Sequence, residues 1–276
     1  LLQNILGFDH PQYGHLPLIL GADKKKMSKR HGATSVLEYK EDGYLPKALI
    51  NFMAFLGWNP GTEKEIYSLK NLIKDFSIKK VQKSGAVFNI EKLNSINSHY
   101  IRQKPLNELT DLCIPYLIKD NLIKKDEDQF EIISTGEKIS KENLENIVSL
   151  YQKRLEKLSE ISELVDFFFQ EIDYQKKLLK WKDLNIEETN TSLDESKEIL
   201  SNISEDNFNK NHLAKVLLEK SKEFGDKLDR EGDRGCLLWP LRVALTGKKN
   251  SAGPFEIAAI LGKEKTIKRI NQALTK

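Results

Sequence analysis

The sequence predicts a mainly α-helical protein, in which a helical unit is followed by two helical bundles. From about residue 34 onward, apolar residues recur at the three- and four-residue steps that place them on one face of a helix. The apolar–polar alternation typical of half-buried strands is nearly absent. Any strand is therefore expected near the N-terminus or at a domain junction. The length of 276 residues is enough for two or three domains.

Residues 34–105 are predicted to form the first helical unit. A helix is expected over residues 44–56, with a proline inside its first turn and Gly57 just past its end, which are the usual helix bounds. A second helix is expected over residues 68–76, with its first serine as the N-cap. A third begins at Glu91.

The first bundle is predicted over residues 106–184, after a boundary at Pro105. Residues 106–121 show a helical pattern, and residues 124–138 are polar and punctuated by glycine. The longest run of helical spacing follows, from residue 144 to residue 168. It ends in three consecutive phenylalanines that could stack on bases, but this spacing favours a place in the core.

The second bundle is predicted over residues 185–276. Its opening segment, residues 185–192, is polar and acidic and is interpreted as a linker or turn. Pro254 is expected at the first position of a helix. Helices are predicted over residues 194–203, 209–224, 237–246 and 263–274.

Composition excludes several classes of protein. No apolar stretch approaches the roughly 18 residues that span a bilayer. The net charge of +3 is too mild to establish nucleic-acid binding by itself. Cys113 and Cys236 are isolated thiols without metal-ligand spacing, so no zinc is predicted and a reducing, cytoplasmic location is expected.

The most informative segment is Lys26-Met27-Ser28-Lys29-Arg30. Two lysines three positions apart, with a small hydroxyl between them, make a compact cationic loop. Such a loop can hold a polyphosphate while a phosphoryl bond breaks, because a lysine ammonium neutralises the developing charge. A solvated charge run is the alternative for these five residues alone.

The surroundings of this lysine loop resemble the bacterial-type glutamyl-tRNA synthetases, a class I family. The resemblance covers nearly the whole chain and is weakest between about residues 105 and 235. The matching segments are residues 14–21 (GHLPLILG), 26–36 (KMSKRHGATSV), 43–46 (GYLP), 56–61 (LGWNPG), 86–89 (AVFN), 92–93 (KL), 99–102 (HYIR), 240–247 (PLRVALTG) and 261–266 (LGKEKT).

The resemblance implies a two-step reaction. Glutamate attacks the α-phosphate of ATP, and the glutamyl group then passes to the 3′ end of tRNA. Lys26, Ser28 and Lys29 match the family's catalytic loop, and Lys26, Met27 and Lys29 are expected to contact ATP. Mg²⁺ is expected to accompany ATP.

The resemblance also divides the chain. Residues 1–33 match the end of the catalytic domain with its ATP-phosphate loop, and residues 34–105 match the domain that contacts the tRNA stem. The bundles at 106–184 and 185–276 match anticodon-binding domains. The family's second ATP signature, His-x-Gly-His, is absent, and so is a βαβ series. We therefore expect the C-terminal part of a longer synthetase, inactive alone.

The implied partner is tRNA(Glu), bound by a monomer, and the sequence does not decide whether tRNA(Gln) is also charged. Arg154 is the predicted tRNA contact, with an ion pair to an acid such as Glu156 as the alternative. Arg242 lies in an apolar helix and is expected to form a structural ion pair. A non-catalytic tRNA-binding or assembly module is the alternative function, although such a module has no use for the lysine loop. Glutaminyl-tRNA synthetase shares the loop, but its C-terminal half is β-barrel.

Overall fold

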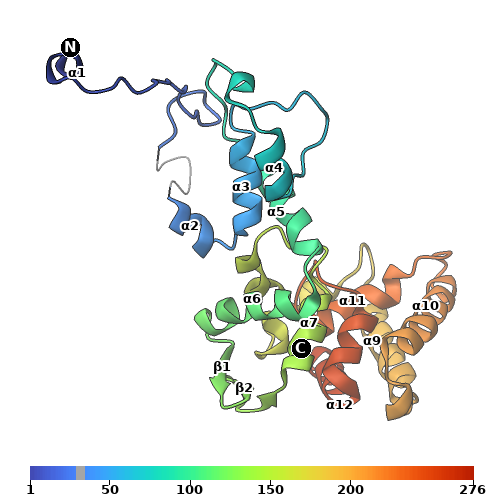
Figure 1. Ribbon diagram of the computed structural model, residues 1–276. Helices are drawn as coiled ribbons and strands as arrows, with labels where there is room; N and C mark the ends of the chain where they lie inside the picture. Colours follow the sequence, from blue (N-terminus) through green and yellow to red (C-terminus); the bar gives the residue numbers. More distant parts are fainter. Residues whose placement is uncertain (29–34) are drawn as a thin grey trace. The chain divides into compact units, whose positions relative to one another are not determined.

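The computed structural model describes residues 1–28 and 35–276, which divide into two compact units, Leu1–Gln103 and Lys104–Lys276 (Figure 1). Helices dominate both units, so the predicted mainly α fold is confirmed. Within the described ranges, no helix is long and apolar enough to cross a membrane. The predicted domain boundaries at residues 33, 105 and 184 stay predictions.

The helices of the first unit begin at the predicted signals. α3 (Pro46–Ala54) has its proline at the first turn, and α4 (Leu69–Asp75) follows Ser68, whose hydroxyl accepts the Asn71 N–H at 3.2 Å. The other helices of this unit are α1 (Leu2–Leu6), α2 (Val36–Glu41), the 3-10 helix η2 (Ile78–Lys80) and α5 (Ile90–Arg102).

Two buried amides fix the loops of the first unit to the packed helices α3 and α5. Asn97 on α5 accepts the Leu45 N–H at 2.8 Å, and Asn51 on α3 accepts the Tyr67 N–H at 2.6 Å. Both asparagine side chains are fully buried. Because buried polar groups require partners, these two bonds specify where the chain enters α3 and α4.

The second unit opens with α6 (Leu106–Lys119) and a small antiparallel sheet. β1 (Ile123–Asp126) pairs with β2 (Gln129–Ile132), and β2 pairs with β3 (Lys138–Ile139). The expectation that strands lie near the N-terminus or a domain junction is therefore wrong. The strands are too short to show a clear alternation, and they carry cross-strand charge pairs such as Lys124 with Glu131 at 2.8 Å.

The long apolar pattern of residues 144–168 is not one helix. It contains α7 (Lys141–Ser149), η3 (Leu158–Glu160), α8 (Ile161–Val165) and η4 (Asp166–Phe168). The Glu160 carboxylate accepts the N–H groups of Glu156 and Lys157, at 2.9 and 3.2 Å, which satisfies backbone donors outside a helix. The apolar residues stay buried through the break, so their spacing indicated burial but not helix continuity.

Residues 185–192, predicted as a linker, begin α9 (Ile186–Ser201), so that prediction is wrong. Asn185 and Glu188 form a reciprocal capping box, with side-chain to backbone distances of 2.8 and 2.7 Å. The buried residues of this helix include small polar side chains, among them Ser192 and Ser196. The polar composition therefore serves close helix packing here instead of solvent exposure.

The centre of the second unit is α11 (Gly235–Thr246). It packs against α9, α10 (Lys210–Lys227), α12 (Pro254–Leu274) and η5 (Lys176–Leu179), and η6 (Glu205–Asn207) precedes α10. Pro240 inside α11 cannot donate to the carbonyl of Cys236, but the Ser192 hydroxyl donates to it at 2.8 Å. Pro254 opens α12 as predicted, and Gly262 kinks that helix just before the predicted start at residue 263.

Candidate nucleic-acid interface

The lysine loop is held at its base by short backbone pairings. Leu20 forms an antiparallel bridge with Lys26 and a parallel bridge with Val87. The Met27 N–H donates to the Ile19 carbonyl at 3.1 Å. These contacts fix where the first residues of the loop leave the body of the first unit.

The predicted loop residues are described only in part. Lys26 is exposed, and Met27 and Ser28 are half-buried. Lys26 forms no ion pair with residues 1–28 or 35–276, so its charge can be used by a ligand. Lys29 lies outside the described residues. The catalytic and ATP-binding roles of these four residues stay predictions.

Arg154, the predicted tRNA contact, is exposed beside the loop that precedes α12. Its guanidinium donates to the Ser251 carbonyl at 2.7 Å and lies 5.8 Å from the ring centroid of Tyr151. Tyr151 is buried, and its hydroxyl accepts the Ala252 N–H at 3.3 Å. The arginine is thus oriented by the loop before α12, and not by an ion pair with Glu156, the alternative interpretation.

Arg242 lies on α11, and the positive charge of Arg154 acts on it. Its Nε is buried without a hydrogen-bond partner, and it forms no ion pair with any residue that the structure describes, so the predicted structural ion pair is wrong there. Burial lowers the pKa of Arg242, and the charge of Arg154 lowers it further, against the opposite effect of Tyr151. We call Arg154 and Arg242 the arginine pair.

The sequence around Arg242 argues against an ion pair with a carboxylate on its own helix. A helical arginine finds local carboxylates three or four positions away. The residues at those positions are Leu238, Trp239, Leu245 and Thr246.

A carboxylate near the arginine pair is already engaged. Glu256 forms an ion pair with Lys210 at 2.7 Å and accepts the Gly253 N–H at 3.0 Å. Burial alone raises the pKa of Glu256, but the bonds from Lys210 and Gly253 and the charges of Lys210 and Arg154 lower it below its ordinary value. The arginine pair therefore keeps its positive charge and one unused N–H donor.

The arginine pair has the chemistry of an anion or base-edge receptor. A guanidinium presents a rigid set of donors that fits phosphates and the edges of splayed bases. Two cations held close together raise the free energy of the empty site, and a bound anion lowers it.

The phenylalanines 167–169 fit the core interpretation better than base stacking. Phe167 and Phe169 are buried, with exposed fractions of 2% and 1%, and Phe168 is half-buried. The core interpretation is confirmed for the two outer residues.

Two protein-family models match this chain. The one described as anticodon binding domain matches residues 108–274, and the one described as tRNA synthetases class I (E and Q), catalytic domain, matches residues 1–95. Glutamate–tRNA ligase 1 of Caldicellulosiruptor saccharolyticus is 40% identical over 98% of this chain, and the glutamate–tRNA ligase of Elusimicrobium minutum is 36% identical over 97%. The chain belongs to the glutamate–tRNA ligase family.

This ligase-family chain spans about half the length of the curated relatives it matches, 52% and 50% of the two named above. Two crystal structures of glutamate–tRNA ligases match over the full chain and 53% of their own length. The one from Elizabethkingia meningosepticum, determined in complex with its amino acid, has a TM-score of 0.76 at 27% identity. The one from Elizabethkingia anophelis has a TM-score of 0.73 at 26% identity. The arginine pair lies within the anticodon-binding match, and the lysine loop lies within the catalytic-domain match.

Proposed function

We propose that this chain is the C-terminal part of a glutamate–tRNA ligase, which activates glutamate with ATP and transfers it to the 3′ end of tRNA. One observation carries the proposal. Inside the matched anticodon-binding domain, neither arginine of the arginine pair forms an ion pair with a described residue, the charge of Arg154 acts on Arg242, and the buried Nε of Arg242 has no hydrogen-bond partner among those residues. A polyanion with splayed bases supplies both a charge and an acceptor for this site.

The lysine loop is proposed to serve the first step. As glutamate attacks the α-phosphate, negative charge grows on the leaving pyrophosphate, and Lys26 and Lys29 stabilise that charge. Ser28 donates a hydroxyl hydrogen bond, and Met27 contacts the nucleotide. Lys26 is exposed and forms no ion pair with residues 1–28 or 35–276, which fits such a role.

Magnesium is proposed to enter with ATP. Among the described residues, no group of three or more His, Cys, Asp or Glu side chains could hold a metal ion. Mg²⁺ is commonly bound through substrate phosphates with few protein ligands, and it would neutralise phosphate charge beside the lysines.

The arginine pair is proposed to bind the anticodon of tRNA(Glu). Arg154 is held by the Ser251 carbonyl and Arg242 projects from α11, so the two donors come from separate, fixed elements. The ligase is proposed to act as a monomer in the cytoplasm. Whether the same protein also charges tRNA(Gln) is tested by a parallel aminoacylation reaction.

The test compares the full-length protein with this chain. The full-length protein should catalyse glutamate-dependent exchange of pyrophosphate into ATP and should glutamylate tRNA(Glu); a parallel reaction tests tRNA(Gln). This chain alone should bind tRNA and catalyse neither step. A full-length protein that binds tRNA but activates no glutamate would contradict the proposal and favour the binding-module alternative.

A further inference from the structure

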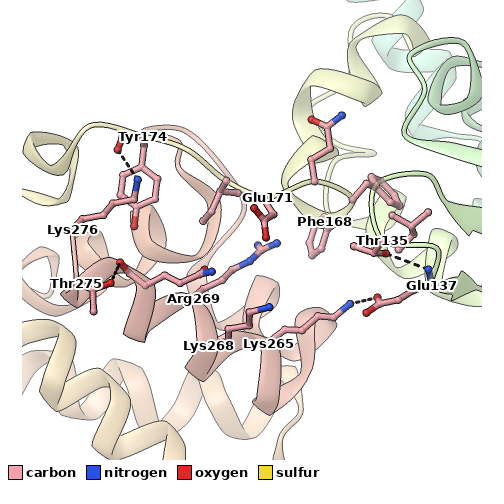
Figure 2. Close-up of a pocket in the computed structure, with 15 residues that line it drawn as sticks. Thr135, Glu137, Phe168, Glu171, Tyr174, Lys265, Lys268, Arg269, Thr275 and Lys276 are labelled. Carbon is pink, nitrogen blue, oxygen red and sulfur yellow. Dashed lines mark hydrogen bonds and ion pairs between the residues drawn. The ribbon is translucent and has the colours of Figure 1, made fainter.

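A second basic site lies on the second unit, in a cavity of about 370 Å³ (Figure 2). Its walls come from the last part of α12, from the segment after η4 and from the turn between β2 and β3. A volume of this size is typical of small-molecule sites. Four of its lining residues are cationic and two are acidic.

Two of these cations have no acidic partner among the residues that the structure describes. Arg269 donates to the backbone carbonyls of Leu245 and Phe167, which are neutral, and neither it nor Lys268 forms an ion pair within the described part of the chain. Burial lowers the pKa of Arg269 to about 10, against the opposite effect of Tyr174. A guanidinium this poorly solvated is stabilised by an anion that enters the cavity.

Two of the remaining cations that line the cavity are paired with acids. Lys265 pairs with Glu137, and Lys276 pairs with Asp173 at 2.9 Å. Glu171 is exposed and forms no ion pair with the described residues. The cations of the cavity without an ion pair to a described residue are therefore Lys268 and Arg269, and these two exceed the single unpaired acid, Glu171, by one charge.

The wall opposite these cations is aromatic. Figure 2 shows Phe168 across the cavity from Lys265 and Arg269. Phe168 is half-buried, and its ring lies on that of buried Phe167, with centroids 4.4 Å apart and an interplanar angle of 36°. Because this stacking fixes the ring, its exposed part offers a preformed apolar surface.

We propose that this cavity binds a nucleotide, with its phosphate at Lys268 and Arg269 and its base against Phe168. A nucleotide combines in one small molecule the anion and the flat aromatic group that fit the two walls, whereas an acidic side chain supplies only the anion. The nucleotide is either part of RNA, a case that rests on the proposed function, or a free molecule. The site is separate from the arginine pair and shares no residue with it.

The first experiment titrates this chain with AMP and with adenosine, and binding is followed by calorimetry and by NMR shifts of the cavity residues. AMP should bind more tightly than adenosine. Lys268→Glu should weaken AMP binding roughly tenfold or more, the effect of losing one charge-assisted hydrogen bond. Phe168→Leu should also weaken it. Lys222→Glu, which changes an exposed lysine on α10 that forms no ion pair with the described residues, is the control and should leave AMP binding unchanged.

Three results would overturn the proposal: no AMP binding at millimolar concentration, equal affinity for AMP and adenosine, or equal effects of the changes at Lys268 and Lys222. A second titration with tRNA separates the two sources of the nucleotide. If Lys268→Glu weakens tRNA binding more than Lys222→Glu, the nucleotide belongs to RNA. If only AMP binding falls, it is free. Failure of tRNA to bind at all would remove the proposed function but leave the AMP result standing.

Discussion

Replacing Arg242 by methionine is predicted to stabilise the second unit and to weaken tRNA binding. Methionine keeps a long, flexible and largely apolar side chain, but it removes the buried Nε and the charge beside Arg154. Because Arg242 has no side-chain partner among the described residues, the change leaves none of them unsatisfied. Stability and binding should therefore move in opposite directions.

The magnitude follows from the buried donor. A buried, unsatisfied N–H costs about 1–3 kcal/mol, and Arg242 is only half-buried, so we expect the free energy of unfolding to rise by about 1 kcal/mol. In a unit of this size, that change raises Tm by about 2–4 °C. Loss of a charge-assisted hydrogen bond to RNA costs about 1.5–3 kcal/mol, or a roughly ten- to hundredfold loss of affinity.

Urea unfolding and filter binding on the same preparations measure both effects. Arg154→Met is the matched control, since it also removes one arginine of the pair but breaks the bond to the Ser251 carbonyl. This control should weaken tRNA binding without a gain in stability. If Arg242→Met lowered the free energy of unfolding by 1 kcal/mol or more, Arg242 would have a structural partner and the reasoning would be wrong.

Three further predictions concern separate parts of the chain. In the full-length ligase, Lys29→Ala should slow adenylate formation by about a hundredfold, since one preorganised contact to developing charge contributes about 2.7–4 kcal/mol; pyrophosphate exchange at a near wild-type rate would remove the lysine loop from the mechanism. Gly235→Ala should destabilise the second unit by about 1–3 kcal/mol, because a Cβ would lie 2.3 Å from the Trp181 ring. Gly14→Ala, with nothing within 4 Å, is its control, and equal urea midpoints for the two variants would contradict the clash. Glu256 has a folded pKa below its ordinary 4.5, so its stabilising effect is complete above pH 4.5 and is lost as the pH falls through the folded pKa. Glu256→Gln should therefore lose less stability than wild type on acidification, and identical acid limbs in urea titrations would exclude this contribution.

The helices were predictable where a local signal fixes an end. Ser68 and Pro254 each begin a helix because a cap or a fixed φ acts on neighbouring residues. The break after Ser149 was not predictable from spacing, since the apolar residues continue inward through a non-helical segment. The start of α9 was missed because the polar residues 185–192 were interpreted as an exposed linker. Asn185 and Glu188 have the spacing of a capping box, which predicts a helix start at this point.

The candidate site also has one part that the sequence predicted and one part that it did not. A compact signature identified the lysine loop, because its residues are adjacent in sequence. The arginine pair consists of residues 154 and 242, which are far apart in sequence, and the charge of Arg154 acts on Arg242 in the folded unit. Sequence spacing carries no signal for such a long-range charge interaction. It showed only that α11 offers Arg242 no carboxylate of its own.

Anticodon binding by the arginine pair is tested by a filter-binding titration of this chain with tRNA(Glu) and with the same tRNA carrying a swapped anticodon, at two salt concentrations. Affinity for both should fall with salt, with a log–log slope of roughly 0.7–0.9 for each phosphate neutralised. The wild-type chain should prefer tRNA(Glu) at both salt concentrations, and Arg242→Met should lose that preference. Equal affinity of the wild-type chain for the two tRNAs would leave only nonspecific electrostatics and contradict anticodon binding by the arginine pair.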